Sequence, residues 1–225
     1  SIAGYVDLLL GESAGILGQM QRNFLQRVSA NIHRLASMID DLVKVTQFDA
    51  GTFELERSPV DLVGVIEEAI TDASNQFREK ELVVNLSLDD SLPELPADLD
   101  GIRQIVGQML TNAYLVSPSG SEISIIAMSD QMQLPKTSSP VDVIFLSVED
   151  RGGGIMPDDI PRVFSRKYKA ENPLIDGLGD TGVGMSIAKA LVEAHNGYLW
   201  VESEPGVGSI FKIAVPLNTL AQVEE

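Results

Sequence analysis

The stretch that decides the fold is DTGVGMSIAKALVEAHNG, residues 180–197, in which three glycines frame an apolar run with helical spacing. Gly182 and Gly184 leave the backbone uncovered where the helix would begin, and Gly197 lies where it would end. Uncovered amide groups at the start of a helix are well suited to hold an anion. The stretch therefore predicts a helix from about Gly184, with an anion-binding loop before it.

Two familiar phosphate-binding motifs do not fit this stretch. Residues 177–182 match the glycine spacing of the dinucleotide fingerprint, but that fingerprint needs a buried strand directly before its first glycine. The preceding residues are polar and include a proline, KYKAENPLID. A Walker loop needs Lys and then Ser or Thr after its last glycine, where Met185 and Ser186 stand here. A different anion site is therefore expected.

The composition describes an ordinary globular domain with an acidic surface. Of 225 residues, 44% are hydrophobic and 22% are charged, and there is no cysteine, which excludes disulfides and thiolate catalysis. The formal net charge is -17, because 33 acidic residues face 16 basic ones. Such a surface repels nucleic acid, so we expect no nucleic-acid partner. The sequence contains no apolar run long enough to span a membrane.

The first 50 residues have the pattern of two helices. An apolar face runs along residues 1–10, and the segment GESAGILG (11–18) interrupts it. A second apolar stripe then follows alternating steps of three and four residues: Leu25, Val28, Ile32, Leu35, Ile39, Leu42 and Thr46. Two helices bury such stripes poorly by themselves, so we expect a four-helix bundle from two chains. A hairpin that covers the next domain within one chain is the alternative.

The remainder of the chain alternates between helical and strand patterns. Residues 49–59 contain a glycine and a proline and mark a boundary. Helices are predicted over 61–81, 98–117 and from about 184, and strands over 82–88, 122–129, 142–150, 198–204 and 209–217. Because these helices and strands interleave while several strands pair through hairpins, the pattern favours an α+β sandwich with a mixed sheet.

Polar and glycine-rich positions in this second part suggest a nucleotide site. Asp150 ends a predicted strand, where its carboxylate can accept a hydrogen bond from an exocyclic amine, and Gly152–Gly154 allow the backbone to approach a flat base. Gln108 and Asn112 lie four residues apart on one helical face. An asparagine oxygen is a suitable ligand for magnesium.

The order of these elements resembles the ATP-binding domain of two-component sensor histidine kinases, which share a superfamily with gyrase and heat-shock-chaperone ATPases. The resemblance rests on the Asn-bearing helix followed by DRGGGI (150–155), GDTGVGM (179–185) and GVGSIF (206–211), and it extends over essentially the whole chain. It implies a dimerisation hairpin over residues 1–50 that is truncated at its start, a junction over 51–60, an ATP-binding catalytic domain over 61–218 and a tail over 219–225.

The resemblance also implies roles for individual residues. Asn112 corresponds to the second asparagine of the N-box helix and should coordinate the Mg²⁺ that bridges the phosphates of ATP, while Gln108 stands at the first asparagine. Asp150 corresponds to the aspartate that reads the adenine amino group. The other nucleotide-binding residues that it implies are Gly152, Gly154, Ile155, Tyr168, Lys169, Gly179, Thr181, Gly182, Val183, Gly184 and Met185.

Three departures from the family pattern bear on activity. The phosphoacceptor histidine would fall shortly before Ser1, outside these residues. Gln108 replaces the first N-box asparagine, and Leu115 and Val116 replace a Lys-Tyr pair, which removes a phosphate contact. Lys167 occupies the second aromatic position of the phenylalanine box, whose first aromatic is Phe164.

We therefore expect the kinase core of a sensor histidine kinase, which transfers the γ-phosphate of ATP to an upstream histidine and then to a response regulator. The implied partners are a second copy of the chain, a response-regulator receiver domain and an upstream sensor domain. The expected location is cytoplasmic, with membrane anchoring of the full-length protein left open. The alternatives are a non-catalytic dimerisation and regulatory module, which the changes at Gln108 and Leu115 favour, and an anti-sigma type serine kinase, which the helices of residues 1–50 disfavour.

Neither histidine of the chain is a catalytic candidate. His33 lies off the apolar stripe of the second helix. His195 precedes Asn196 and Gly197 at the end of the last predicted helix, where a histidine suits the helix dipole and the cap.

Overall fold

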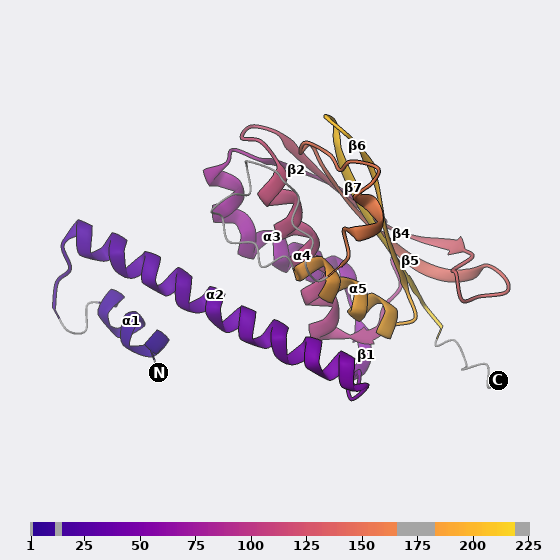
Figure 1. Cartoon of the computed structure of the whole chain (residues 1–225), viewed down its shortest axis with the longest axis horizontal. Coiled ribbons are helices and arrows are strands. Elements are labelled where there is room, and N and C mark those ends of the chain that lie inside the picture. Colours follow the sequence, from indigo (N-terminus) through magenta and orange to yellow (C-terminus); the bar gives the residue numbers. More distant parts are fainter. Residues whose placement is uncertain (1, 12–14, 166–182, 219–225) are drawn as a thin grey trace. The chain divides into compact units, whose positions relative to one another are not determined.

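The computed structural model describes residues 2–11, 15–165 and 183–218, and it leaves out some side chains of the second helix, His33 among them (Figure 1). The chain forms two compact units that divide between Phe53 and Glu54. In the described ranges, no helix is both long and apolar enough to cross a membrane.

The first unit consists of the two expected helices, α1 (Ile2–Leu10) and α2 (Gln19–Ala50), which pack against each other. Gly18 precedes α2, and the backbone N–H of Gly18 donates a hydrogen bond to the side chain of Gln21. Gly51 ends α2 with a φ of 65°, the left-handed conformation that favours glycine. Many apolar side chains of this unit are exposed: Ile2, Tyr5, Leu8, Leu9, Met20, Phe24, Val28, Leu35, Ile39 and Val43.

The second unit is the α+β sandwich that the sequence predicts. Its elements, in chain order, are β1 (Arg57–Val60), α3 (Leu62–Glu79), β2 (Val83–Leu88), β3 (Leu95–Asp98), α4 (Leu99–Val116), β4 (Glu122–Met132), β5 (Val141–Asp150), a 3-10 turn (Ile160–Arg162), α5 (Gly184–Ala194), β6 (Tyr198–Glu204) and β7 (Gly208–Pro216). All the helices and strands predicted beyond residue 60 are present, with small differences at their ends.

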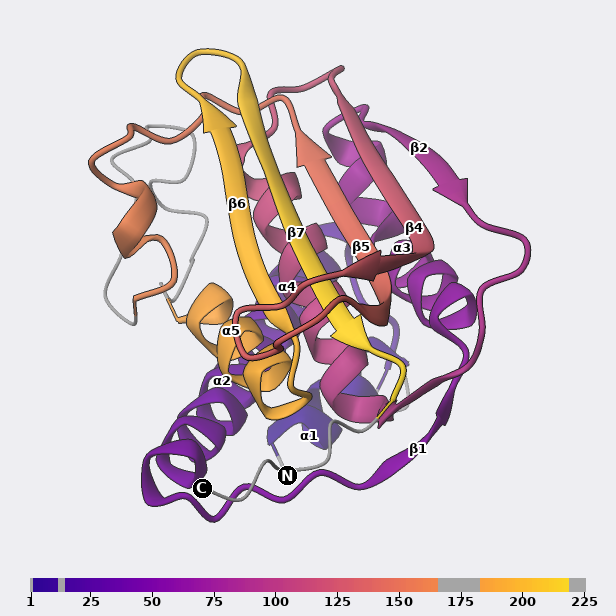
Figure 2. The same ribbon diagram turned by 90° about the vertical axis from the view of Figure 1, so that its right-hand side faces the viewer.

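The main sheet is mixed and has the order β2-β4-β5-β7-β6. Strands β2 and β4 are parallel, whereas β4, β5, β7 and β6 pair antiparallel with their neighbours. Figure 2 shows α3, α4 and α5 together on one face of this sheet. In β4 the buried side chains Ile123, Ile125 and Ala127 alternate with more exposed ones, whereas β5 and β7 are buried along most of their length.

Helix α4 lies at the centre of this core. Its N-cap is Asp98, whose Oδ1 accepts a hydrogen bond from Gly101 N at 2.7 Å. The helix packs against α3, α5 and β5. The apolar positions that its spacing predicts are all buried: Ile102, Ile105, Val106, Met109, Leu110 and Ala113. The polar residues of α4 that face the candidate site are therefore held on a rigid element.

A small two-stranded sheet was not expected from the sequence. Strand β1 lies within residues 51–60 and pairs antiparallel with β3, so that Arg57 is opposite Asp98 and Val60 is opposite Leu95. Both strands are short and contain proline, and they are far apart in the sequence, so no local alternation marks them. Their pairing places Asp98 at the start of α4, where it also accepts a hydrogen bond from Glu56 N at 2.9 Å.

Candidate functional site

The candidate site lies where the end of β5, helix α4, and the starts of α5 and β7 come together. Contacts at the glycines establish this arrangement. A Cβ on Gly208 would collide with the carbonyl oxygen of Asp150, and one on Gly152 would lie 2.7 Å from Cγ2 of Val116, the last residue of α4. A Cβ on Gly184, the first residue of α5, would collide with Oε1 of Gln108. Four elements that are separate in the sequence thus converge.

Asp150 is the buried polar centre of this arrangement. Its side chain is 1% exposed. Oδ1 accepts hydrogen bonds from Gly152 N at 2.8 Å and Ser209 N at 3.3 Å. Oδ2 is buried and has no hydrogen-bond partner within the described part of the chain. A buried acceptor without a partner is costly, so the site is suited to a ligand that supplies a donor.

Burial raises the pKa of the Asp150 carboxyl from 3.8 to about 6, against the lowering effect of the backbone hydrogen bonds from Gly152 and Ser209. Glu149 raises this pKa further, and Arg151 lowers it slightly. Arg151 pairs with Glu149, at 3.0 Å between Nη1 and Oε1, and not with Asp150. The carboxyl is therefore still ionised at neutral pH, at a cost in stability that a donor on Oδ2 would offset.

The loop after Asp150 approaches its neighbours closely. Gly154 has a φ of 67°, and a Cβ there would collide with the carbonyl oxygen of Glu204 in β6. The next residue, Ile155, donates its backbone N–H to Ser203 Oγ at 2.8 Å. Glycine is thus required at Gly154 by both conformation and space. The loop is fixed against β6 beside the buried carboxylate.

The opposite wall comes from α4 and the start of α5. Gln108 and Asn112 are both half-buried on α4. Within the described part of the chain, no hydrogen bond engages the Asn112 carboxamide. Within the described part of the chain, helix α5 begins after Val183 without a side-chain cap. The first amide groups of a helix have no intrahelical acceptor and can bind an anion. Met185 is half-buried in the same first turn.

Comparison with known proteins decides the family. The sequence profile described as histidine kinase-, DNA gyrase B-, and HSP90-like ATPase matches residues 97–219, more than half of the chain. The chain belongs to this ATPase family. The match begins just before α4 and includes every element that forms the candidate site.

Similar members of the family are histidine kinases by name. The sensor histidine kinase WalK of Bacillus subtilis is 27% identical over 208 residues, which cover 92% of this chain but only 32% of WalK. This chain therefore spans about a third of that relative. Among solved structures, full-length ShkA in complex with AMPPNP has a TM-score of 0.71 at 24% identity, covering 94% of this chain and 42% of ShkA.

A second solved structure supports the fold over nearly the whole chain. The Acinetobacter baumannii histidine kinase AdeS has a TM-score of 0.66 at 18% identity, and the match covers 97% of this chain and 94% of that one. At such identity the likeness shows the fold alone. The α+β architecture with N-terminal helices is thus that of histidine kinases.

Several residues that the sequence assigns to this ATPase site lie outside the described residues. They are Tyr168, Lys169, Gly179, Thr181 and Gly182, together with Lys167 of the phenylalanine box. The first aromatic of that box, Phe164, is described. Its ring meets Phe211 of β7 edge-on, with 6.2 Å between centroids, and Lys189 Nζ of α5 lies 5.9 Å from its centroid. Phe164 thus connects the segment after the 3-10 turn with β7 and α5.

Lys80 is a residue whose role the sequence did not indicate. Its ammonium donates to the carbonyl oxygens of Tyr114, Leu115 and Ser117, at 2.7, 3.1 and 3.2 Å, and lies 4.6 Å from the centroid of the Tyr114 ring. It therefore binds the C-terminal carbonyl groups of α4, where a cation is favoured. It holds the end of α4 and does not replace the phosphate-contacting lysine whose place Leu115 takes.

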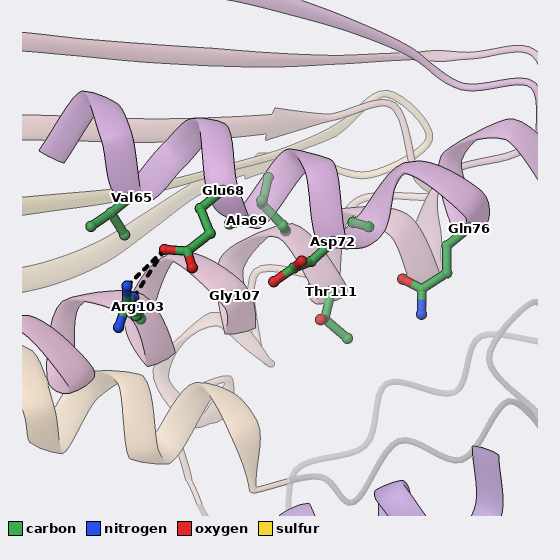
Figure 3. Close-up of a pocket in the computed structure, with 10 residues that line it drawn as sticks. Val65, Glu68, Ala69, Asp72, Gln76, Arg103, Gly107 and Thr111 are labelled. Atoms are coloured by element: carbon green, nitrogen blue, oxygen red, sulfur yellow. Dashed lines mark hydrogen bonds and ion pairs between the residues drawn. The ribbon is translucent and has the colours of Figure 1, made fainter. Parts of the chain in front are cut away.

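A separate cavity between α3 and α4 does not belong to the site (Figure 3). Its volume is about 290 Å³, and a Glu68–Arg103 ion pair of 3.0 Å lies at its edge. Gln108, Asn112 and Asp150 do not line it. Within the described ranges there is also no group of three or more His, Asp or Glu side chains that could hold a metal ion.

The raised pKa of Asp150 makes a prediction about stability. The folded state holds this proton more tightly than the unfolded chain, so the contribution of Asp150 to stability is largest below pH 3.8 and is lost as the pH rises through about 6. Between pH 4 and pH 7, the free energy of unfolding of Asp150→Asn should therefore rise relative to wild type by about 2 kcal/mol. Urea denaturation across this pH range measures the difference.

The matched control is Glu149→Gln, which removes the neighbouring, partly exposed carboxylate of β5 and leaves the buried Asp150 in place. A stability difference between Asp150→Asn and wild type that stays constant from pH 4 to pH 7 would contradict a buried Asp150 carboxyl with a raised pKa.

Proposed function

We propose that this chain is part of the ATP-binding kinase core of a two-component sensor histidine kinase. The observation that carries the proposal is the unpartnered Oδ2 of Asp150, buried at the edge of the site. The exocyclic amine of adenine offers N–H donors, and an ionised carboxylate is a strong acceptor for them. Gly152, Gly154 and Ile155 would line the same pocket, because they form the loop that follows Asp150.

The triphosphate would extend from the adenine pocket toward α4 and the start of α5. There the backbone amides of Gly184 and Met185 would face the phosphates, since the first amides of a helix lack intrahelical acceptors, and Val183 would lie beside them. Gln108 would contact them from α4. Tyr168, Lys169, Gly179, Thr181 and Gly182, which precede α5 in the chain, would contribute from the lid that the family resemblance implies.

Asn112 would hold Mg²⁺ through its carboxamide oxygen. Magnesium prefers oxygen ligands and usually keeps several waters while it binds substrate phosphates, so a single protein ligand fits its chemistry. When bound, the ion would neutralise phosphate charge, which matters in a chain whose net charge is -17. Asn112 would thus orient the phosphates from the rigid, buried helix α4.

The γ-phosphate would pass to a histidine that lies upstream of Ser1, and from there to the receiver domain of a response regulator. Such transfers depend on positioning and on charge stabilisation more than on covalent chemistry by the protein. The exposed apolar side chains of α1 and α2 support a homodimer, because a second copy could bury them in a four-helix bundle. An upstream sensor domain would complete the protein.

The other function that an observation favours is a non-catalytic dimerisation and regulatory module. Leu115 stands where the family resemblance expects a phosphate-contacting lysine, and Lys80 is engaged with the carbonyl groups of α4 instead. Gln108 departs from the same motif. Such a module could still bind nucleotide, so ATP binding does not separate the two functions and phosphoryl transfer does.

Asp150→Asn tests the adenine pocket. The variant keeps an acceptor for Gly152 N and Ser209 N but places an amide donor where Oδ2 lies, opposite the donors of adenine. We expect ATP affinity to fall by about tenfold or more, and the preference for ATP over GTP to fall with it, because guanine presents an acceptor at that position. Calorimetric titration with both nucleotides measures this, with Glu149→Gln as control. An equal loss for ATP and GTP would count against the role.

Asn112→Ala tests the magnesium ligand. With Mg²⁺ present, the variant should bind ATP about tenfold more weakly than wild type, or weaker still. In EDTA, its affinity for ATP should change little. The control is Thr111→Ala, at the neighbouring exposed position that lines the separate α3–α4 cavity. The same Mg²⁺ dependence in Asn112→Ala and wild type would remove Asn112 from the metal site.

Phosphoryl transfer separates the kinase from the regulatory module. A chain extended at its N-terminus to include the upstream histidine should incorporate acid-labile phosphate from ATP labelled on its γ-phosphate, and the extended chain with Asp150→Asn should incorporate much less. An extended chain that carries a histidine and binds ATP, yet stays unlabelled, would favour the regulatory module.

A further inference from the structure

His195 is buried and uses both nitrogens of its ring. It caps the C-terminus of α5 and is 1% exposed. Nδ1 lies 2.8 Å from the carbonyl oxygen of Leu191, and Nε2 accepts a hydrogen bond from the backbone N–H of Asp98 at 3.0 Å. Because the carbonyl can only accept, Nδ1 carries the proton and the ring is neutral. His195 therefore joins the end of α5 to the residue that begins α4.

The ring fits closely at the start of α4. Asp98 is already the N-cap of this helix, and its side chain accepts from Gly101 N and Glu56 N. A Cβ on Gly101 would lie 3.1 Å from Cε1 of His195, so the ring occupies the space beside the first turn of α4. A shift of α5 along α4 would break the hydrogen bond from Asp98 and drive the ring against this turn.

A second contact lies at the other end of the same helix pair. Gly184 begins α5 and has no room for a Cβ because Gln108 of α4 fills that space. At an α-helical rise of about 1.5 Å per residue, Asp98 and Gln108 are about 15 Å apart along α4, and Gly184 and His195 are a similar distance apart along α5. The two helices thus run antiparallel with contacts at matched positions, side by side in Figures 1 and 2.

We propose that His195 is a positioning residue that fixes the register of α5 against α4. It thereby sets where the first amides of α5 lie relative to Gln108 and Asn112. These amides are some 16 Å from the His195 ring along α5, at a rise of about 1.5 Å per residue. This inference rests on the proposed function, since it concerns the walls of the phosphate site. His195 touches no substrate and acts through the helix that it holds.

The neutral ring is essential to this role. A proton on Nε2 would face the Asp98 N–H donor and remove the hydrogen bond. The charged groups that face the ring are Arg57 of β1, whose Nη2 donates to Ala194 O at 3.4 Å, and Asp98. Burial lowers the pKa of His195 below 6.5, which keeps the ring neutral near pH 7. Its contribution is therefore present above about pH 6.5 and is lost as the pH falls through the lower pKa of the folded state.

Two substitutions separate the hydrogen bond from the volume of the ring. His195→Gln can offer an amide oxygen to Asp98 N–H and cannot titrate, whereas His195→Phe keeps a ring and leaves that N–H without a partner. Arg103→Gln is the control, because it breaks an exposed ion pair of α4 on the side of α3. For each chain, the affinity for ATP with Mg²⁺ is measured by calorimetry from pH 5.5 to pH 8.

At pH 8 we expect His195→Phe to bind ATP about tenfold more weakly than wild type, and His195→Gln and Arg103→Gln to bind within about threefold of it. As the pH falls through the lowered pKa of His195 in the folded state, wild type should lose affinity relative to His195→Gln. Taking this ratio at each pH cancels the titration of Asp150 and of ATP, which both chains share. A ratio that stays constant, or unchanged affinity in His195→Phe, would overturn the proposal.

A second measurement does not depend on ATP. Without nucleotide, hydrogen exchange at the first turn of α5, residues 184–187, should be faster in His195→Phe than in wild type and Arg103→Gln, with circular dichroism as the check on folding. Unchanged exchange there would overturn the proposal. A wild-type chain that binds no ATP would contradict the proposed function instead. Hydrogen exchange would then decide whether His195 fixes the register of α5 against α4. If His195→Phe does not fold, the pH dependence of His195→Gln against wild type remains the test.

Discussion

The burial of α4 is the constraint on which the second unit depends. This helix packs against α3 on one side, α5 on another and the sheet through β5, and the apolar side chains of its core-facing stripe, from Ile102 to Ala113, are almost completely buried. Both of its ends are held by specific groups, Asp98 at the start and the ammonium of Lys80 at the end. A helix fixed in this way can present polar residues to a ligand with little loss of conformational entropy on binding.

The buried carboxylate of Asp150 shows how this rigidity relates to function. An ionised side chain with one unpartnered oxygen destabilises the ligand-free protein, and its raised pKa reflects that cost. The surrounding backbone has little freedom to relieve it, because Gly152, Gly154 and Gly208 have no room to move closer or to carry side chains. The site is thus preorganised around a donor that the described part of the chain does not provide.

The first unit shows the opposite balance between burial and exposure. Of the described apolar side chains of α1, only Val6 is buried, and much of the stripe along α2 is exposed. Exposed apolar residues spaced along two helices are typical of a surface that another helical pair covers. A single chain therefore buries the apolar core of the second unit, whereas it leaves many apolar side chains of the first unit exposed.

Sequence patterns alone determined most of the fold. The spacing of apolar residues in α4, the capping Asp61 before α3 and the glycines around α5 are local signals, and local signals are what a sequence displays directly. The order of motifs, through the family resemblance, also assigns Asp150, Gln108, Asn112 and Gly184 to one candidate nucleotide site. What these patterns could not supply was any feature that depends on residues far apart in the chain.

Tertiary structure alone decided the pairing of β1 with β3, the hydrogen bonds of Lys80 and the burial of His195. Each depends on contacts between segments separated by many residues, as between Asp98 and His195, so neither partner shows an unusual pattern in its own segment. Histidine at a helix end is typical of an exposed cap, and only packing against the start of α4 turned it into a buried link. The sequence predicted which residues surround the candidate site, and long-range packing decided how the described ones are held.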